Sequence, residues 1–240
     1  MRMKINIIGS GNVATHLCNA LRDKADVIPV NSRTLEGFDE SADVSLIAVS
    51  DNAIREVAGR LPALKGILAH TSGSVPIDIL KESHSNVGVF YPLQTFSKDV
   101  PLDYSKIPFF IEATDKNSEA ILVSLARNIS ENVTIADSEK RKALHVASVF
   151  ACNFANHLWH ISDTLLKEND LTFSTILPLL EETLRKVSNV SPHDAQTGPA
   201  RRHDTKVVDS HLQLLANHPD YQTIYNLLST SISTLYQCHQ

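Results

Sequence analysis

The sequence feature that most constrains this chain is a glycine-containing turn close to its N-terminus. Residues 4–8 form a short, mostly apolar segment that stops at Gly9, and the residues from Gly9 to Ala14 follow the pattern G-x-G-x-x-A. Apolar residues then recur at helical spacing over 13–21. A strand, a glycine turn and a helix in this order are typical of the first unit of a dinucleotide-binding domain.

Each small residue of this motif has a physical role. The first glycine permits the tight turn, the second lets a pyrophosphate approach the backbone, and a small third residue keeps the helix close to the sheet. The helix N-terminus adds unpaired N–H groups and a partial positive charge. The residues expected to bind the cofactor here are Gly9, Ser10, Gly11, Asn12, Val13 and Ala14. Two alternatives stay open: a glycine turn without a ligand, and a site for another nucleotide such as S-adenosylmethionine.

The end of the second expected strand discriminates between nicotinamide cofactors. NAD-binding domains place Asp or Glu there to hold the ribose 2′-hydroxyl, whereas an arginine accommodates a 2′-phosphate. This chain has no carboxylate at that point, because Asn31, Ser32 and Arg33 follow Val30. The Arg33 guanidinium can pair with a phosphate through two hydrogen bonds. We therefore expect these three residues to bind NADP rather than NAD; the alternative is that Arg33 is an ordinary solvated arginine.

Short apolar segments alternate with helical patterns through the first half of the chain. We expect strands over 4–8, 27–30, 44–49, 66–69, 86–89 and 108–111, and helices over 13–21, 52–61 and 118–129. Continuous apolar runs favour a parallel sheet that is covered on both faces. The predicted fold class is α/β, with an N-terminal Rossmann-type parallel sheet.

Glycine is rare in the second half, which indicates long helices. Seven of the eight glycines lie at or before Gly88, and residues 138–167 contain neither glycine nor proline. Helices are expected over 138–167, 174–187, 205–216 and 219–236, with Pro178 kinking the second or marking a new start. The predicted domains are a Rossmann domain (1–115), a connecting helix and linker (116–136), and an all-α domain (137–240).

Residues that follow the later strands are candidates for the nicotinamide end of the site. Ligands bind at the carboxyl ends of parallel strands. The candidates after the third and fourth strands are Val49, Ser50, Thr71, Ser72 and Gly73, and the candidate for substrate after the fifth strand is Gln94. The turn that follows the fourth strand is equally compatible with a plain turn. Asp51 is expected to cap the next helix.

Composition excludes several classes of function. The 240 residues include 22 Lys and Arg and 27 Asp and Glu, a net charge of -5 that disfavours binding to nucleic acid or to an anionic membrane. No apolar run is long enough to span a membrane, and the N-terminal residues do not resemble a secretory signal. Cys18, Cys152 and Cys238 lie too far apart for a disulfide framework or a Cys-x-x-Cys metal site. A cytoplasmic protein is expected.

Two sets of segments resemble known families. GSGNVA (9–14), NSR (31–33), AVS (48–50) and HTSGS (70–74) resemble the pyrroline-5-carboxylate reductases and deazaflavin-dependent NADP oxidoreductases, in a group that includes 6-phosphogluconate dehydrogenases. YPLQTF (91–96), HVASVFACNF (145–154) and TGPARRHD (197–204) are similar to a bacterial family of predicted NADP oxidoreductases with a helical domain of unknown function. The resemblance covers nearly the whole chain. It implies an NADP cofactor, a 6-phosphogluconate dehydrogenase C-terminal-like domain that forms a homodimer, and an active site between the domains.

One departure from the wider group concerns catalysis. The 3-hydroxyacid dehydrogenases carry a catalytic lysine on the first long helix and an asparagine four residues later. Here Lys142 is followed by Val146, and Lys140 by Leu144, so the pair is absent. This puts hydroxyacid oxidation in doubt, and His145 lies near where that lysine would point.

His145 also begins a polar stripe on the helix expected over 138–167. On a helical wheel it groups with Ser148 and, within about 80°, Asn153, opposite a stripe of phenylalanines. Small neutral side chains suit a cleft, although a solvated face is the alternative. Because histidine titrates near neutral pH, His145 is the candidate proton donor, and Ser148 and Asn153 are candidates to hold the substrate.

Two further polar clusters lie in the second half of the chain. Arg201 and Arg202 can clamp a carboxylate or phosphate of the substrate, lie in a surface loop, or reach a partner subunit. His157, His160 and Asp163 recur at one-turn spacing, but no other metal-ligand motif supports them, so no metal is expected.

The leading hypothesis is an NADP-dependent oxidoreductase that acts on a small carbonyl or imine substrate. One alternative is an NADP-binding sensor or interaction protein without hydride transfer, which the missing lysine favours. Another is a methyltransferase that uses the same glycine turn for S-adenosylmethionine. The apolar helical half favours a homodimer.

Overall fold

The computed structural model describes residues 2–237, so Cys238 lies outside the described residues. The chain forms two compact units, Met1–Asn153 and Phe154–Gln240. Residues 116–136, expected to connect two domains, form a helix and a strand of the first unit. Within the described residues, no helix is both long enough and apolar enough to span a membrane.

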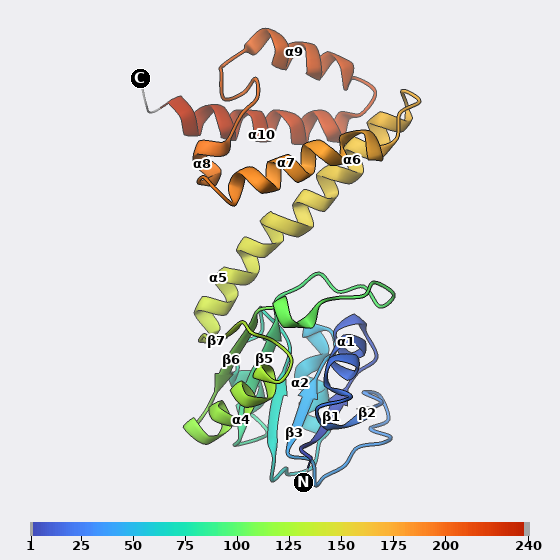
Figure 1. The fold of residues 1–240 in the computed structure, drawn as a ribbon, viewed down its shortest axis with the longest axis vertical. Helices are drawn as coiled ribbons and strands as arrows, with labels where there is room; N and C mark the ends of the chain where they lie inside the picture. Colours follow the sequence, from blue (N-terminus) through green and yellow to red (C-terminus); the bar gives the residue numbers. More distant parts are fainter. Residues whose placement is uncertain (1, 238–240) are drawn as a thin grey trace. The chain divides into compact units, whose positions relative to one another are not determined.

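A mostly parallel sheet forms the centre of the first unit (Figure 1). Its seven strands lie in the order β2-β1-β3-β4-β5-β6-β7. They are β1 (Lys4–Ile8), β2 (Asp26–Val30), β3 (Val44–Ile47), β4 (Ile67–His70), β5 (Val87–Pro92), β6 (Phe109–Ala113) and β7 (Val133–Ile135). The predicted Rossmann-type α/β fold is confirmed.

One strand departs from the expected parallel arrangement. β6 pairs antiparallel with β5, whereas β7 is parallel to β6. A parallel neighbour needs a crossover, usually a helix, but residues 93–108 contain only the short 3₁₀ turn Tyr104–Lys106. The chain therefore turns back, and β6 runs against its neighbour.

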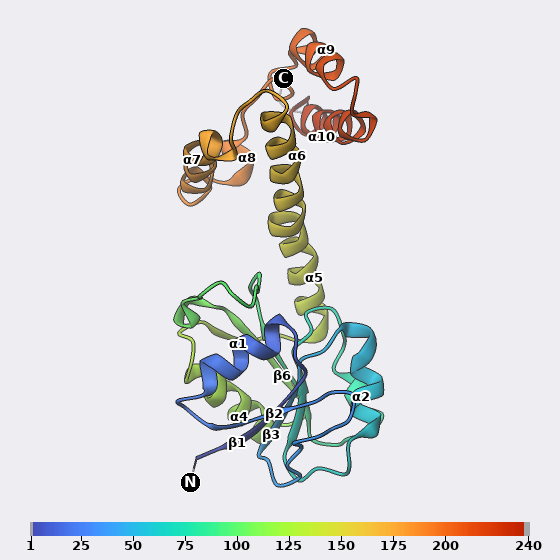
Figure 2. The ribbon, with the colours of Figure 1, turned by 90° about the vertical axis from the view of Figure 1, so that its right-hand side faces the viewer.

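Helices cover both faces of this sheet (Figure 2). α1 (Asn12–Leu21) and α4 (Lys116–Arg127) pack on one face, and α2 (Ile54–Arg60) and the short α3 (Asp78–Lys81) pack on the other. Successive side chains of a strand point to opposite faces, so Ile7 packs with α1 while Ile8 packs with α2. Full burial of an Ile or Leu side chain stabilises the fold by about 1.5–3 kcal/mol.

The helix expected over 138–167 is interrupted. α5 (Ser138–Ser148) is followed by a π-helical turn (Val149–Phe154) and then by α6 (Ala155–Lys167). A π turn holds more residues than an α turn, so the residues in and after it are rotated away from the positions of an ideal wheel. The angles calculated for an ideal α-helix therefore do not apply beyond Ser148, and the grouping of Asn153 with His145 stays a prediction.

The second unit is all-α, as predicted. It contains α6, the 3₁₀ turn Phe173–Ile176, α7 (Leu177–Val187), α8 (Pro192–Ala195), α9 (Thr205–Leu214) and α10 (Pro219–Gln237). Pro178 lies in the first turn of α7, where a missing N–H costs no helix bond, so it marks a new start as predicted. Among the described residues of this unit, Ile161, Ala200 and Leu215 are the only buried hydrophobic side chains.

Candidate functional site

The turn between β1 and α1 has the geometry of a phosphate-binding turn. Gly9 has φ 139°, and a Cβ there would lie 2.2 Å from the carbonyl oxygen of Ala48, so only glycine fits. A Cβ on Gly11 would meet nothing within 4 Å, which leaves open space above the turn. No side chain caps α1 at Gly11, so its first N–H groups remain available to an anion.

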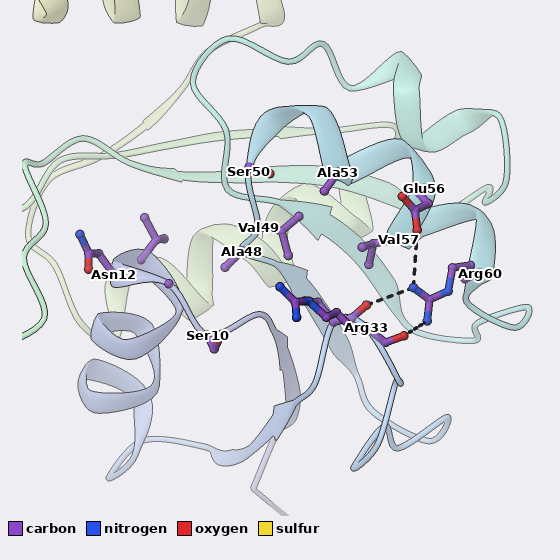
Figure 3. A pocket seen from close by; sticks show the side chains of 13 residues that line it. Ser10, Asn12, Arg33, Ala48, Val49, Ser50, Ala53, Glu56, Val57 and Arg60 are labelled. Atoms are coloured by element: carbon purple, nitrogen blue, oxygen red, sulfur yellow. Dashed lines mark hydrogen bonds and ion pairs between the residues drawn. The ribbon is translucent and has the colours of Figure 1, made fainter.

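This turn opens onto a cavity of about 600 Å³ at the carboxyl ends of β1, β2 and β3 (Figure 3). β1 lies between β2 and β3, and this reversal of strand order is where open α/β sheets bind ligands. The cavity is lined by Ser10, Gly11, Asn12, Val13, Ser32, Arg33, Ala48, Val49, Ser50, Ala53, Glu56, Val57 and Arg60. A second cavity of about 520 Å³ shares Ser10, Ser32 and Arg33 and adds Gly9, Pro29, Val30 and Asn31. Most of the residues predicted to bind cofactor thus lie together, and Ala14 packs into the core beside the turn.

The loop after β2 is held in a fixed shape. Asn31 Oδ1 accepts hydrogen bonds from the backbone N–H groups of Arg33 at 2.9 Å and Thr34 at 3.3 Å. Arg60, at the end of α2, donates to the carbonyls of Ser32, at 3.3 Å, and Arg33. Figure 3 shows the Arg33 side chain extending beneath Ala48 and Val49. The loop backbone is therefore anchored while the Arg33 side chain lies in the cavity.

Sequence reasoning missed Arg60. It lines the cavity, and its guanidinium lies 3.8 Å from the carboxylate of Glu56. An arginine four residues after a glutamate is the usual pattern of a solvated helix face. The strand order could have identified Arg60, because α2 follows β3 and therefore lies beside the crevice where ligands bind.

In the turn after β4, the polar side chains form hydrogen bonds with the backbone of this turn and of β3. Thr71 Oγ1 donates to the carbonyl of Ile47 at 3.3 Å, and Ser72 Oγ accepts from the N–H groups of Ser74 and Val75 at 3.1 and 3.0 Å. Neither cavity described above is lined by Thr71, Ser72 or Gly73. Asp51 accepts a hydrogen bond from the Ser74 hydroxyl.

The expectation that Asp51 caps the next helix was wrong. The N-cap of the 3₁₀ turn Asp51–Ala53 is Ser50, and no side chain caps it. The neighbouring turn after β4 supplies a hydroxyl to the Asp51 carboxylate, which joins two loops at the carboxyl edge instead.

His145 lies against this same turn, at the end of β5. Its Nδ1 is 3.2 Å from the hydroxyl of Tyr91, and His145 is half-buried. Burial raises the pKa of Tyr91, so its phenol stays protonated at neutral pH. The structure thereby places a histidine and a phenol together at the carboxyl edge of the sheet.

A buried arginine fixes this arrangement. Arg141, one turn before His145, is fully buried and donates to the carbonyls of Ser72, at 3.2 Å, and Val75. It also forms an ion pair with Glu112 on β6. Arg141 thus fastens α5 to the turn after β4.

The other candidate residues have local partners or lie at the surface. Ser148 Oγ donates to the carbonyl of Leu144 at 2.8 Å, and Asn153 is exposed within the π turn. Gln94 is exposed, and its Oε1 accepts from the N–H of Thr95 at 2.8 Å.

In the second unit, Arg201 is held by its own neighbours. It donates to the carbonyls of Gln196 and Asp194, and its guanidinium lies 5.0 Å from the ring centroid of Tyr236. Arg202 is exposed. Among the described residues, no group of three or more His, Cys, Asp or Glu side chains could hold a metal ion.

Comparison with known proteins identifies one family model and several similar solved structures. A family model described as a domain of unknown function, DUF2520, matches residues 107–232. No curated protein matches the chain. The chain is 38% identical to a crystal structure named “putative NADP oxidoreductase” from Bacteroides fragilis, with a TM-score of 0.89. That match covers 97% of this chain and 98% of the other.

Two more distant structures share the fold. A protein from Thermotoga maritima is 22% identical with a TM-score of 0.71, and a 1-pyrroline-5-carboxylate reductase from Streptococcus pyogenes is 11% identical with a TM-score of 0.64. Each match covers 97% of this chain and 98% of the other. The predicted similarity to these reductases is confirmed for the fold. Because the family model spans more than half of the chain, and the Bacteroides fragilis protein is similar along nearly all of it, the chain belongs to the DUF2520 family.

Proposed function

We propose that this protein is an NADP-dependent oxidoreductase that transfers hydride between NADP(H) and a small carbonyl or imine substrate. The observation that carries the proposal is the cavity at the β1–β3 crevice, which joins an uncapped helix N-terminus to the Arg33 side chain. The similar Bacteroides fragilis protein, which is named for NADP, supports it.

The residues present fit such a cofactor. A pyrophosphate needs close access to the backbone, and the open space above Gly11 gives it. Among the described residues that line the main cavity, Glu56 has the only carboxylate. It pairs with Arg60, so its negative charge is partly neutralised and repels a 2′-phosphate less. Arg33 then supplies the charge that favours NADP over NAD.

The chain's own residues would assist a hydride transfer through position and hydrogen bonding. When bound, the nicotinamide supplies the hydride chemistry. His145 would donate a proton or hydrogen bond to the substrate heteroatom, directly or through water. Ser148, Asn153, Gln94, Arg201 and Arg202 remain proposed substrate contacts.

Calorimetric titration with NADPH and NADH tests the cofactor part of the proposal. We expect NADPH to bind at least tenfold more tightly, and Arg33→Ala to remove that difference of about 1.4 kcal/mol, because the 2′-phosphate loses its partner. Arg22→Ala, which removes an equal charge from the exposed C-cap of α1, should leave the ratio unchanged. Equal affinities for the two cofactors in the wild type would contradict the proposal.

Two other functions make different predictions. An NADP-binding sensor, favoured by the missing lysine and asparagine pair, would bind NADPH without oxidising it in a screen of carbonyl and imine substrates. A methyltransferase would bind S-adenosylmethionine, and Arg33→Ala would leave that affinity unchanged.

A further inference from the structure

Three segments that are distant in sequence meet at the carboxyl edge of the sheet. Tyr91 is the next-to-last residue of β5, His145 lies on α5, and Gly73 lies in the turn after β4. The rings of Tyr91 and His145 meet edge to face, with centroids 6.2 Å apart. A Cβ on Gly73 would lie 2.6 Å from Tyr91 Cζ and 2.8 Å from both the Tyr91 hydroxyl and His145 Nδ1. Gly73 is therefore needed for space, since any side chain there would push the two rings apart.

The direction of the hydrogen bond between the two rings follows from burial. Tyr91 is only 8% exposed, and His145 Nδ1 is the only hydrogen-bond partner of its hydroxyl among the described residues. If Nδ1 carried the proton, the phenolic proton would be buried without an acceptor, which is costly. The hydroxyl therefore donates and Nδ1 accepts, so a neutral His145 ring carries its proton on Nε2.

The backbone around the pair is held on both sides. Arg141 lies four residues before His145, on the same side of α5, and its guanidinium binds the carbonyls of Ser72 and Val75 that flank Gly73. The turn after β4 thus cannot move away from α5 without breaking the contacts of a buried charge.

We propose that Tyr91 is a positioning residue that fixes the tautomer of His145, so that Nε2–H is the group offered to the substrate. Nε2 makes no hydrogen bond within the described residues, which leaves it available. The substrate group that it meets is then a hydrogen-bond acceptor, such as a carbonyl oxygen or an imine nitrogen. The role toward substrate rests on the proposed function, whereas the tautomer does not.

Nitrogen NMR of ring-labelled histidine at alkaline pH tests the tautomer directly. His145→Gln identifies the His145 signals by their loss. In the wild type we expect Nδ1 to resonate as an unprotonated acceptor and Nε2 as a protonated nitrogen. In Tyr91→Phe, which keeps the ring packing and removes the hydroxyl, Nδ1 should shift toward the protonated position as the two tautomers mix.

Tyr104→Phe is a matched control. The Tyr104 hydroxyl lies 3.0 Å from Nδ1 of another histidine, His16, so this variant should move the His16 signals and leave those of His145 unchanged. A second variant, Gly73→Ala, should reproduce the His145 shift because its methyl group separates the rings. A wild-type His145 protonated on Nδ1, or the same tautomer in Tyr91→Phe, would overturn the proposal.

NADPH titration separates this proposal from the proposed function. Tyr91 does not line the cofactor cavity, so Tyr91→Phe should bind NADPH within twofold of the wild type. If the wild type fails to bind NADPH while the His145 signals behave as expected, the cofactor assignment fails, and the tautomer that Tyr91 fixes stands on its own.

Discussion

At the scale of single residues, His70 is the side chain whose charge the fold controls most strongly. It ends β4 and is fully buried, and its Nδ1 accepts a hydrogen bond from the N–H of Ser72 at 3.2 Å. Burial, and then the positive charge of Arg141, lower the pKa of His70 to about 4. The folded protein therefore holds this ring neutral at a pH where the unfolded chain would protonate it.

This gives a prediction for stability in mild acid. Since the pKa is lower in the folded state, the neutral ring adds stability above the unfolded value of 6.5, and that stability is lost as the pH falls toward 4. The loss should reach roughly 3 kcal/mol. Urea unfolding of wild type and His70→Asn at pH values across this window measures it. His84→Asn, which changes a less buried histidine, serves as control; an equal slope in wild type and His70→Asn would contradict the prediction.

Buried charges are also where sequence reasoning fails at this scale. Arg141 stands between Lys140 and Lys142, and such a basic run is typical of a solvated helix face. Only the packing of α5 against the turn after β4 turns Arg141 inward. Gly9 and Arg33, by contrast, act through the shape of one local turn and the chemistry of one strand end, so both could be identified from the chain alone.

At the scale of elements, the pair of Arg141 and Glu112 joins α5 to β6. Glu112→Gln should destabilise the protein by about 3 kcal/mol, because it leaves a fully buried guanidinium without its counter-charge. The exposed Glu139 pairs with Lys142 on the same helix, so Glu139→Gln should cost less than about 1 kcal/mol. Urea unfolding measures both; equal losses would show that the buried pair has no special role.

The sequence predicts elements well where their patterns are local. The strands from β1 to β6 and the helices α1, α2 and α4 follow runs of apolar residues, and all lie close to the expected ranges. β7 has three residues with two of them exposed, so it leaves no apolar run to detect. The direction of β6 and the π turn at 149–154 depend on connections and packing, which periodicity does not record.

At the scale of the whole molecule, the helical unit has little core of its own. Its exposed apolar side chains include Leu179, Leu184, Leu214 and Leu227, each more than 60% exposed. A monomer rarely leaves so many large apolar side chains in water. We propose that a second copy of the chain covers them, which makes the protein a homodimer through the helical unit.

Light scattering at micromolar concentration tests this assembly. The expected mass is twice the chain mass of 26.5 kDa, and it should persist on dilution because the covered surface is apolar. A monomeric mass would refute the proposal.

The reversal of the chain at β6 decides which residues can reach the carboxyl edge of the sheet. β7 follows β6 and runs against β1–β5, so it leads away from that edge. α5 begins beside Glu112, where the Ser138 hydroxyl donates a hydrogen bond to the carboxylate. From there the helix runs toward the carboxyl edge of the sheet. Arg141, one turn into the helix, contacts Ser72, and His145, one turn further, lies beside Gly73. Had every strand been parallel, α5 would have started at the carboxyl edge and moved away from it. Its first turn, rather than His145, would then lie at that edge.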